Sequence, residues 1–166
     1  MGHHDHEAEA PRSLRLGILT LSDTRSEEED ISGQTLKKLL TEAGHTISQY
    51  TVCREDPEHM HQVLAAWIDA DLDAIVTNGG TGLTSRDGTI EVARRLMQKE
   101  LPGFGEIFRF LSFQQIGPAA ILSRATAGLA SGKILICLPG STKAVRLAIE
   151  RILIPQLPHF VREARR

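Results

Sequence analysis

Strand-like segments that alternate with helix-like segments are the feature that most constrains the fold of this chain. Two short apolar runs, 14–21 and 74–77, and a strand-like segment at 46–52 are separated by stretches whose apolar residues recur every three or four positions. Short apolar runs indicate buried strands, and the longer spacing indicates amphipathic helices. Strands that alternate with helices form parallel sheets covered on both faces. The sequence therefore predicts an α/β fold, a three-layer α/β/α sandwich with a mostly parallel sheet.

The second half of the chain continues this pattern less regularly. A stretch rich in small residues, 125–133, is typical of a hairpin or an edge turn around Gly132. It precedes a strongly apolar strand at 133–138. Helices are predicted over residues 32–43, from 57 onward, over 89–99, 105–113 and 142–152, and from 154 to the C-terminus.

The length of the chain, 166 residues, is enough for one domain with a sizeable core. We expect that domain to span residues 13–166. Residues 1–12 are rich in histidine and acidic residues, so we expect a disordered tail there. No apolar run approaches the roughly 20 residues of a membrane span, and we expect no membrane partner.

Charge and cysteine content narrow the class of protein further. The net charge of −2 offers no electrostatic footprint for nucleic acid, so small molecules are the expected partners. Cys53 and Cys137 have no spacing that indicates a disulfide framework or a metal site. This usage favours a reducing compartment, the cytoplasm.

A glycine-rich loop, Thr-Asn-Gly-Gly-Thr-Gly at 77–82, follows the predicted strand at 74–77 and leads through Asp87 into a helix. Glycines allow close backbone approach, and backbone N–H groups there can form an anion-binding concavity. The pattern is neither the dinucleotide fingerprint nor a Walker loop. A plain turn with Asp87 as a helix cap is the competing interpretation. The placement favours a ligand site, because open α/β sheets bind ligands at the carboxyl ends of strands.

Three loops should open at the same edge of a parallel sheet: Ser22-Asp23, the glycine-rich loop, and the segment 139–141. Acidic residues near a phosphate site require a cation, and Mg²⁺ binds one or two carboxylates together with phosphate oxygens. Asp87 is the strongest candidate, because it lies inside the loop; for the others, capping or solvated roles compete. The candidate acids are Asp23, Asp30, Glu55, Asp56 and Asp87, with Glu106 near them in sequence, and Arg86, Lys143 and Arg146 could neutralise phosphates.

Four motifs occur in order along the chain. They are Thr-Asn-Gly-Gly-Thr-Gly with Arg-Asp-Gly-Thr, Gly-Phe-Gly-Glu-Ile-Phe-Arg at 103–109, Leu-Ser-Phe-Gln-Gln-Ile-Gly at 111–117, and Leu-Pro-Gly-Ser-Thr-Lys-Ala at 138–144. Together, from about Leu14 to about Leu157, they resemble the MoaB/MogA family of molybdenum cofactor biosynthesis proteins. The Gly-Glu-Ile-Phe-Arg and Pro-Gly-Ser-Thr-Lys-Ala segments look most like the MoaB branch.

This resemblance implies a molybdopterin-binding fold and binding of molybdopterin, a pterin with a terminal phosphate. In MogA-like members it implies adenylylation of that phosphate with Mg-ATP, so Mg²⁺, ATP and molybdopterin are the expected ligands. It also implies a homotrimer or a homohexamer. A non-catalytic molybdopterin-binding protein is the main alternative, and a binder of some other phosphorylated small molecule is a third.

The resemblance also carries site residues over by position. Asp87 matches a catalytic acid and is the expected metal ligand. MogA-like members have a catalytic Asp two residues before a Pro, where this chain has Glu55, followed by Asp56, before Pro57. A carboxylate misplaced by about a bond length can slow a reaction ~10²-fold. The implied ligand-binding residues are Ser22, Asp23, Asp30, Ser32, Gly33, Gly79, Gly80, Thr81, Gly82, Pro139, Gly140 and Ser141.

Four phenylalanines lie close together in the segment 104–113. One interpretation is a core helix with an aromatic cap, and the other is a contact between subunits. The sequence leaves both open.

Overall fold

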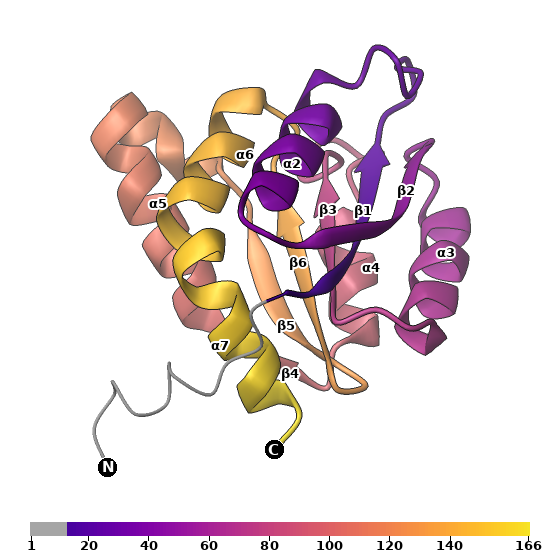
Figure 1. Cartoon of the computed structure of the whole chain (residues 1–166). Coiled ribbons are helices and arrows are strands. Elements are labelled where there is room, and N and C mark those ends of the chain that lie inside the picture. The colour runs from indigo at the N-terminus through magenta and orange to yellow at the C-terminus, as the bar shows by residue number, and fades with distance from the viewer. Residues whose placement is uncertain (1–12) are drawn as a thin grey trace.

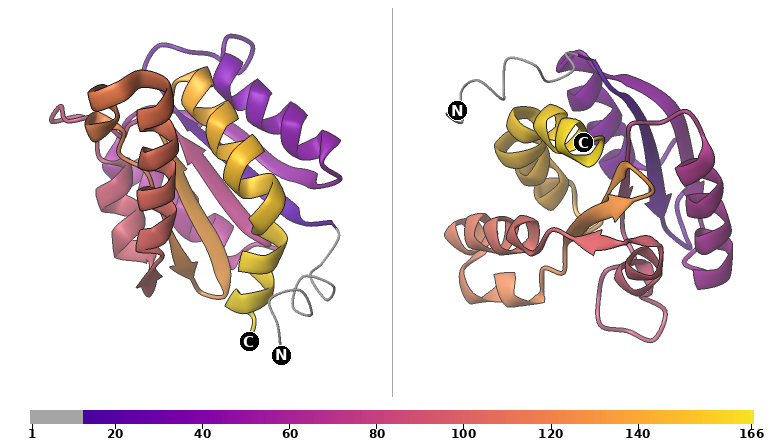
Figure 2. Two further views of the ribbon diagram at one scale, coloured as in Figure 1. Left: turned by 90° about the vertical axis from the view of Figure 1, so that its left-hand side faces the viewer. Right: turned by 90° about the horizontal axis from the view of Figure 1, so that it is seen from below.

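The computed structural model describes residues 13–166 and contains a six-stranded sheet between two layers of helices (Figures 1 and 2). The strand order is β2-β1-β3-β6-β5-β4. The predicted three-layer, mostly parallel α/β architecture is confirmed. The predicted tail at 1–12 lies outside the described residues. Within the described part of the chain, no helix is long and apolar enough to cross a membrane.

Four neighbouring strands pair in parallel, and the sheet continues beyond them through two antiparallel pairs, β6 with β5 and β5 with β4. The parallel strands are β1 (Arg15–Leu21), β2 (Thr46–Cys53), β3 (Ala74–Asn78) and β6 (Lys133–Leu138). β5 (Thr126–Ala130) forms the predicted hairpin with β6, turning through Ser131 and Gly132, which both have positive φ. The parallel strands place the loops after β1, β2, β3 and β6 at one edge of the sheet.

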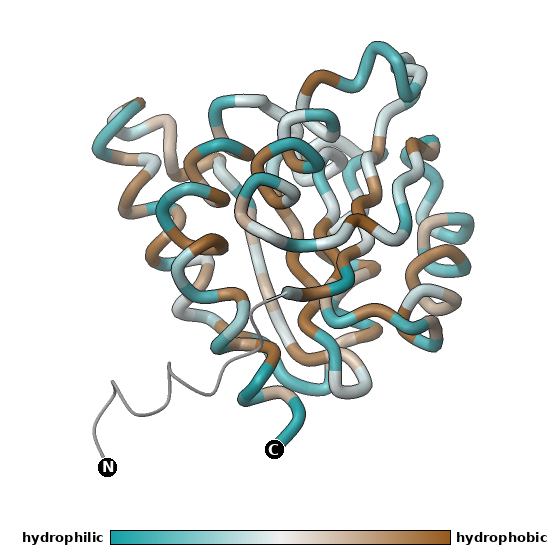
Figure 3. Tube along the Cα trace, viewed as in Figure 1, coloured by the Kyte–Doolittle hydropathy of each residue, from teal (hydrophilic) through white to brown (hydrophobic). Residues whose placement is uncertain are grey.

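Each face of the sheet buries its own apolar cluster, and Figure 3 shows brown, apolar segments gathered along the strands. The face with Leu16 and Ile18 is covered by four helices, α2 (Ile31–Glu42), α5 (Pro102–Ile116), α6 (Thr142–Ala148) and α7 (Ile154–Ala164). The other face is covered by α3 (Pro57–Asp69) and α4 (Thr89–Leu96). A π-helical turn, η2 (Ile149–Leu153), joins α6 to α7, and a 3₁₀ helix, η1 (Gly117–Leu122), follows α5.

The predicted helix at 89–99 is too long. It ends at Leu96, because the next residues add a strand, β4 (Lys99–Glu100), to the edge of the sheet. Lys99 and Glu100 pair with Leu129 and Gly128 of β5. The helix at 105–113 in turn begins earlier, at Pro102, because proline suits the first turn of a helix.

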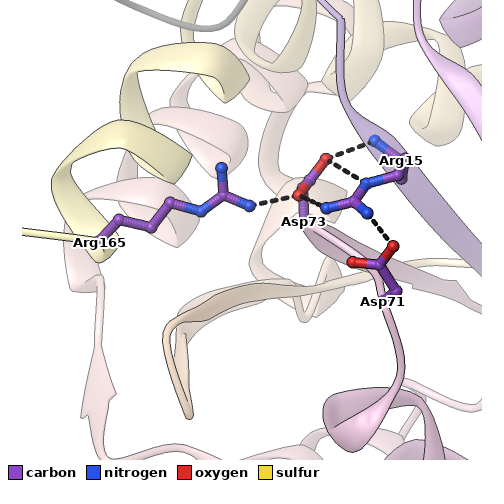
Figure 4. Close-up of polar contacts among 4 residues, drawn as sticks. All are labelled: Arg15, Asp71, Asp73 and Arg165. Carbon is purple, nitrogen blue, oxygen red and sulfur yellow. Dashed lines mark hydrogen bonds and ion pairs between the residues drawn. The ribbon is translucent and has the colours of Figure 1, made fainter.

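Figure 4 shows a cluster of two acids and two arginines. It lies where β1 and β3 begin, at the end of the sheet opposite the loops. The Asp73 carboxylate, only 5% exposed, accepts hydrogen bonds from the Arg15 backbone N–H at 2.6 Å and from the Arg15 Nη2 at 3.0 Å. It also pairs with Arg165, just beyond α7, while Arg15 pairs with the exposed Asp71. Burial opposes ionisation of Asp73, but the hydrogen bonds from the arginines outweigh it and lower its pKa. The cluster attaches the C-terminal helix to the starts of β1 and β3.

Candidate functional site

A cavity of about 380 Å³ lies at the carboxyl ends of β1, β3 and β6. Loops from four parts of the chain converge on it, so Asp87 and Ser141 line the same space. Its lining residues are Leu21, Ser22, Arg25, Glu55, Gly79, Gly80, Thr81, Gly82, Asp87, Gly140 and Ser141. The expected crevice at this edge of the sheet therefore exists.

Two glycines make the floor of this cavity possible. Gly79 and Gly80 have φ values of +94° and +62°, a region that residues with side chains rarely adopt. A Cβ atom on Gly79 would lie 2.3 Å from the Leu21 carbonyl oxygen. The Thr89 hydroxyl donates to the Gly79 carbonyl oxygen at 2.9 Å, which anchors the loop to the start of α4. The loop therefore presents backbone, without side chains, at residues 79–80.

Asp87 belongs to the loop and does not cap the helix. It accepts hydrogen bonds from the Thr84 N–H at 2.9 Å and the Thr84 hydroxyl at 2.6 Å. The N-cap residue of α4 is Gly88, and no side chain caps this helix. The interpretation of Asp87 as the helix cap is therefore wrong. The Thr84 hydrogen bonds lower the pKa of Asp87 and keep its carboxylate charged. A charged carboxylate held in a loop beside a cavity is a ready cation ligand.

Glu55 faces the same cavity from the loop after β2. The pKa of Glu55 is raised, mainly by partial burial and further by the nearby negative charges of Asp23 and Asp87. Asp23 accepts a hydrogen bond from the Glu55 backbone N–H at 3.2 Å and pairs with Arg86. Three carboxylates therefore lie close together here, and Arg86 offsets part of their charge.

Asp56 has a different role from Glu55. Its side chain caps α3 by accepting a hydrogen bond from the His59 N–H at 2.7 Å, and it does not line the cavity. Of the two adjacent acids, Glu55 is the one positioned to reach a ligand.

Asp30, Ser32 and Gly33 lie beneath the site and not in the cavity. Asp30 is fully buried at the N-cap of α2 and accepts hydrogen bonds from the Gly33 N–H at 3.0 Å and the Tyr50 hydroxyl at 2.9 Å. The Ser32 hydroxyl lies 2.8 Å from the side-chain oxygen of Asn78, the last residue of β3. These residues hold the start of α2 against β3, so the structure gives them a supporting position. Pro139 also lies outside the lining, next to Gly140.

The sequence predicts three basic residues near this site, Arg86, Lys143 and Arg146, and does not indicate Arg25 or Arg124. Arg86 pairs with Asp23 but does not line the cavity. Arg25 lines the cavity from the acidic loop after β1, and Arg124 donates to the Gly82 carbonyl oxygen at 2.8 Å. A basic residue inside an otherwise acidic loop was a usable signal for Arg25, whereas nothing local marks Arg124. Lys143 and Arg146 instead line a separate cavity of about 440 Å³ between α5 and α6.

Comparison with known proteins identifies the family. The family described as "probable molybdopterin binding domain" matches residues 17–159. The chain belongs to this family. A molybdenum cofactor biosynthesis protein B from Bacillus anthracis is 47% identical over 98% of this chain and 97% of its own length.

Solved structures agree with this membership. A crystal structure of a molybdenum cofactor biosynthesis protein B has a TM-score of 0.89 at 47% identity, covering 94% of this chain and 98% of that chain. The tungsten cofactor synthesizing protein MoaB from Pyrococcus furiosus has a TM-score of 0.86 at 37% identity, covering 95% and 100%. The predicted membership of the MoaB/MogA family, closest to its MoaB branch, is confirmed.

The chemistry of the acids in this cavity suits a cation that takes only part of its coordination shell from the protein. Among residues 13–166, no group of three or more His, Cys, Asp or Glu side chains is arranged to hold a metal ion alone. Asp87 and Glu55, whose side chains end in carboxylates, both line one cavity. Mg²⁺ commonly binds through one or two carboxylates and completes its shell with phosphate oxygens and water.

Proposed function

We propose that this protein binds molybdopterin in the 380 Å³ cavity and adenylylates its terminal phosphate with Mg-ATP. The observation that carries the proposal is the convergence of the loop at 79–82, Asp87 and Ser141 on one cavity. Membership of the molybdopterin-binding family supports the pterin as ligand. The group of carboxylates supports a cation, and a cation beside an anion-binding loop suits a nucleotide.

In the proposed reaction, a terminal phosphate oxygen of molybdopterin attacks the α-phosphorus of ATP. One oxygen–phosphorus bond forms while the bond to the β-phosphate oxygen breaks, and pyrophosphate leaves. The attacking oxygen is already anionic at neutral pH, so no strong general base is needed. The protein contributes positioning and charge neutralisation, the effects expected of preorganised loops. The backbone N–H groups at 79–82 are the proposed phosphate donors.

Asp87 and Glu55 are the proposed Mg²⁺ ligands, and the bound ion would neutralise phosphate charge. Burial is the main cause of the raised Glu55 pKa, and a cation between the two acids would relieve the repulsion that raises it further. This part of the proposal has a readout besides activity. Titration with Mg²⁺ should lower the Glu55 pKa measured by NMR of the side-chain carboxyl, and an unchanged pKa would contradict Glu55 as a ligand.

Replacement of Asp87 tests the reaction. Single-turnover adenylylation by Asp87→Ala should fall about 10²–10³-fold, the range found when one charge-stabilising group is removed from an active site. Asp71→Ala, at the opposite end of the sheet, is the matched control and should keep the wild-type rate. An undiminished rate for Asp87→Ala at saturating Mg-ATP would rule out this role for Asp87.

One observation favours the second candidate function, a non-catalytic molybdopterin-binding protein. The acid that faces the cavity after β2 is Glu55, one methylene longer than the Asp of MogA-like members. Isothermal titration separates the two candidates. A catalytic protein should bind both molybdopterin and Mg-ATP, whereas a binding module should hold the pterin and ignore the nucleotide.

We also propose that the protein assembles as a homotrimer or homohexamer. Two of the four phenylalanines, Phe104 and Phe108, are buried, while Phe110 and Phe113 are 61% and 55% exposed. Ile107 and Ile116 are exposed on the same helix, so α5 leaves an apolar surface larger than an isolated side chain explains. Light scattering after size exclusion should give three or six times the 18.2 kDa chain mass, and a monomer mass would contradict the proposal.

The proposed compartment is the cytoplasm. Cys53 and Cys137 are both buried and free, which suits a reducing environment. Fractionation of the native host should recover the protein with cytoplasmic markers, and recovery with membrane or secreted fractions would contradict this.

A further inference from the structure

Arg124 reaches the loop at 79–88 from a distant part of the chain. It lies between η1 and β5, and its side chain is 24% exposed. Its Nη1 donates to the Gly82 carbonyl oxygen at 2.8 Å, and its Nη2 pairs with the Glu91 carboxylate on α4. One guanidinium therefore connects the middle of the loop to the helix that follows it.

The middle of this loop has few other attachments. Backbone bonds to Leu138 and Thr89 fix its first two residues. The Thr84–Asp87 contacts close a turn within the loop but attach it to nothing outside. Arg86 pairs with Asp23, but its side chain is 66% exposed, and exposed ion pairs contribute little. The contact between Arg124 and Gly82 is the more shielded of these two attachments.

The direction of the Gly82 carbonyl matters because Gly82 lines the cavity. A carbonyl oxygen turned toward a bound phosphate would repel it, since both carry negative charge. The Arg124 guanidinium engages this oxygen instead. The same positive charge supports ionised Asp87, whose pKa is lowered mainly by Thr84 and to a lesser extent by Arg124.

We propose that Arg124 is a positioning residue that holds the loop at 79–88 and α4 in the geometry that accepts a phosphate. The link from this loop geometry to phosphate binding rests on the proposed function. The planar fork of arginine is required, because it presents several donors in fixed directions and so engages Gly82 and Glu91 at once. Lysine carries the charge but has a single donor nitrogen.

Hydrogen exchange on the ligand-free protein tests the positioning directly. Amides at 81–84 should exchange about tenfold faster in Arg124→Ala than in wild type, as expected when one hydrogen bond to a charged group is lost. Arg94→Ala is the matched control, because Arg94 lies on α4 and pairs with Glu100 away from the loop. Unchanged exchange at 81–84 in Arg124→Ala would overturn the inference.

Binding links this positioning to the site. Isothermal titration should show a Kd for Mg-ATP about tenfold higher in Arg124→Ala, with Arg94→Ala unchanged and Arg124→Lys intermediate. Full recovery by lysine in both measurements would overturn the requirement for the arginine fork. If wild type binds neither Mg-ATP nor molybdopterin while Arg124→Ala exchanges faster, the proposed function fails and the loop role of Arg124 stands.

Discussion

Two carboxylates at opposite ends of the same sheet have opposite electrostatic surroundings. Asp73, at the end where β3 begins, is nearly buried between Arg15 and Arg165, and its pKa is lowered (Figure 4). Glu55, at the cavity, lies near Asp23 and Asp87, and its pKa is raised. The chain thus pairs Asp73, the matched acid, directly with arginines. For Glu55, the unmatched acid, partial burial and two nearby carboxylates outweigh the effect of Arg86.

The contrast between Asp73 and Glu55 indicates that the first acid contributes to stability, whereas the second lies in the candidate functional site. The lowered pKa of Asp73 means that ionisation of this carboxylate favours the folded state, because the hydrogen bonds from the arginines outweigh the cost of burial. Partial burial of Glu55 and repulsion from Asp23 and Asp87 make ionisation of Glu55 unfavourable in the folded state. Proteins keep such arrangements at functional sites, where a ligand supplies the missing charge.

Removing the matched charge should have the largest effect on stability. Asp73→Asn should lower the free energy of unfolding by about 2 kcal/mol at pH 7, because hydrogen bonds to a buried charge are lost. Urea unfolding measures this. Adenylylation and ligand binding should stay unchanged, and Asp71→Asn, at an exposed acid of the same cluster, should cost far less. An equal loss in both variants would break the contrast.

The stabilisation contributed by ionised Asp73 should depend on pH in a direction that its lowered pKa determines. The folded-state pKa of Asp73 lies below its ordinary value of 3.8, so its stabilisation is fully present above pH 3.8. It is lost as the pH falls through the folded-state pKa. The urea curves of wild type and Asp73→Asn should therefore converge below pH 3.8, and a constant difference would contradict the electrostatic cause.

Shortening the unmatched acid, Glu55, should have an intermediate effect, this time on the proposed adenylylation reaction. Glu55→Asp keeps the charge and withdraws the carboxylate by one methylene, toward the Asp of MogA-like members. The single-turnover adenylylation rate should rise about tenfold, within the range for a group misplaced by a bond length. A rate that does not rise would show that the extra methylene does not limit the reaction.

Removing the unmatched charge should have the smallest effect, opposite in sign to that of Asp73→Asn. Because the folded-state pKa of Glu55 is raised above 4.5, its ionisation disfavours folding once the pH exceeds 4.5. Glu55→Gln should raise the free energy of unfolding at pH 7 by a few tenths of a kcal/mol, since Glu55 is only partly buried. The gain should vanish below pH 4.5. Glu28→Gln, in the exposed acidic loop, is the control and should show no such gain.

Local patterns predicted most of the fold. The strands at 74–77 and 133–138 and the hairpin turn at Gly132 lie within a residue of their predicted positions, because apolar runs and turn residues act locally. The end of α4 could not be predicted in this way. Lys99 and Glu100 form a strand only because they pair with the edge of β5, which lies almost thirty residues later in the chain.

The site was predictable where chain order and sheet topology determine it. Parallel strands bring the loops at 79–82 and 139–141 together, so their convergence followed from the pattern. Arg124 could not be found, since its contact with Gly82 depends on how η1 packs. Asp30 is a residue that the sequence places in the site but the structure places beneath it. Its position beside Ser32 and Gly33 resembles part of a ligand motif, but in the folded chain it caps α2.

The helical rod formed by α6, η2 and α7 begins just after Ser141 at the cavity and ends beside Arg165 at the charged cluster. At about 1.5 Å per residue, residues 142–164 span on the order of 35 Å. The carboxyl terminus therefore leaves the molecule far from the cavity mouth. An affinity tag or surface tether fused after Arg166 should therefore attach the protein at the end opposite the cavity and leave the cavity open to solvent.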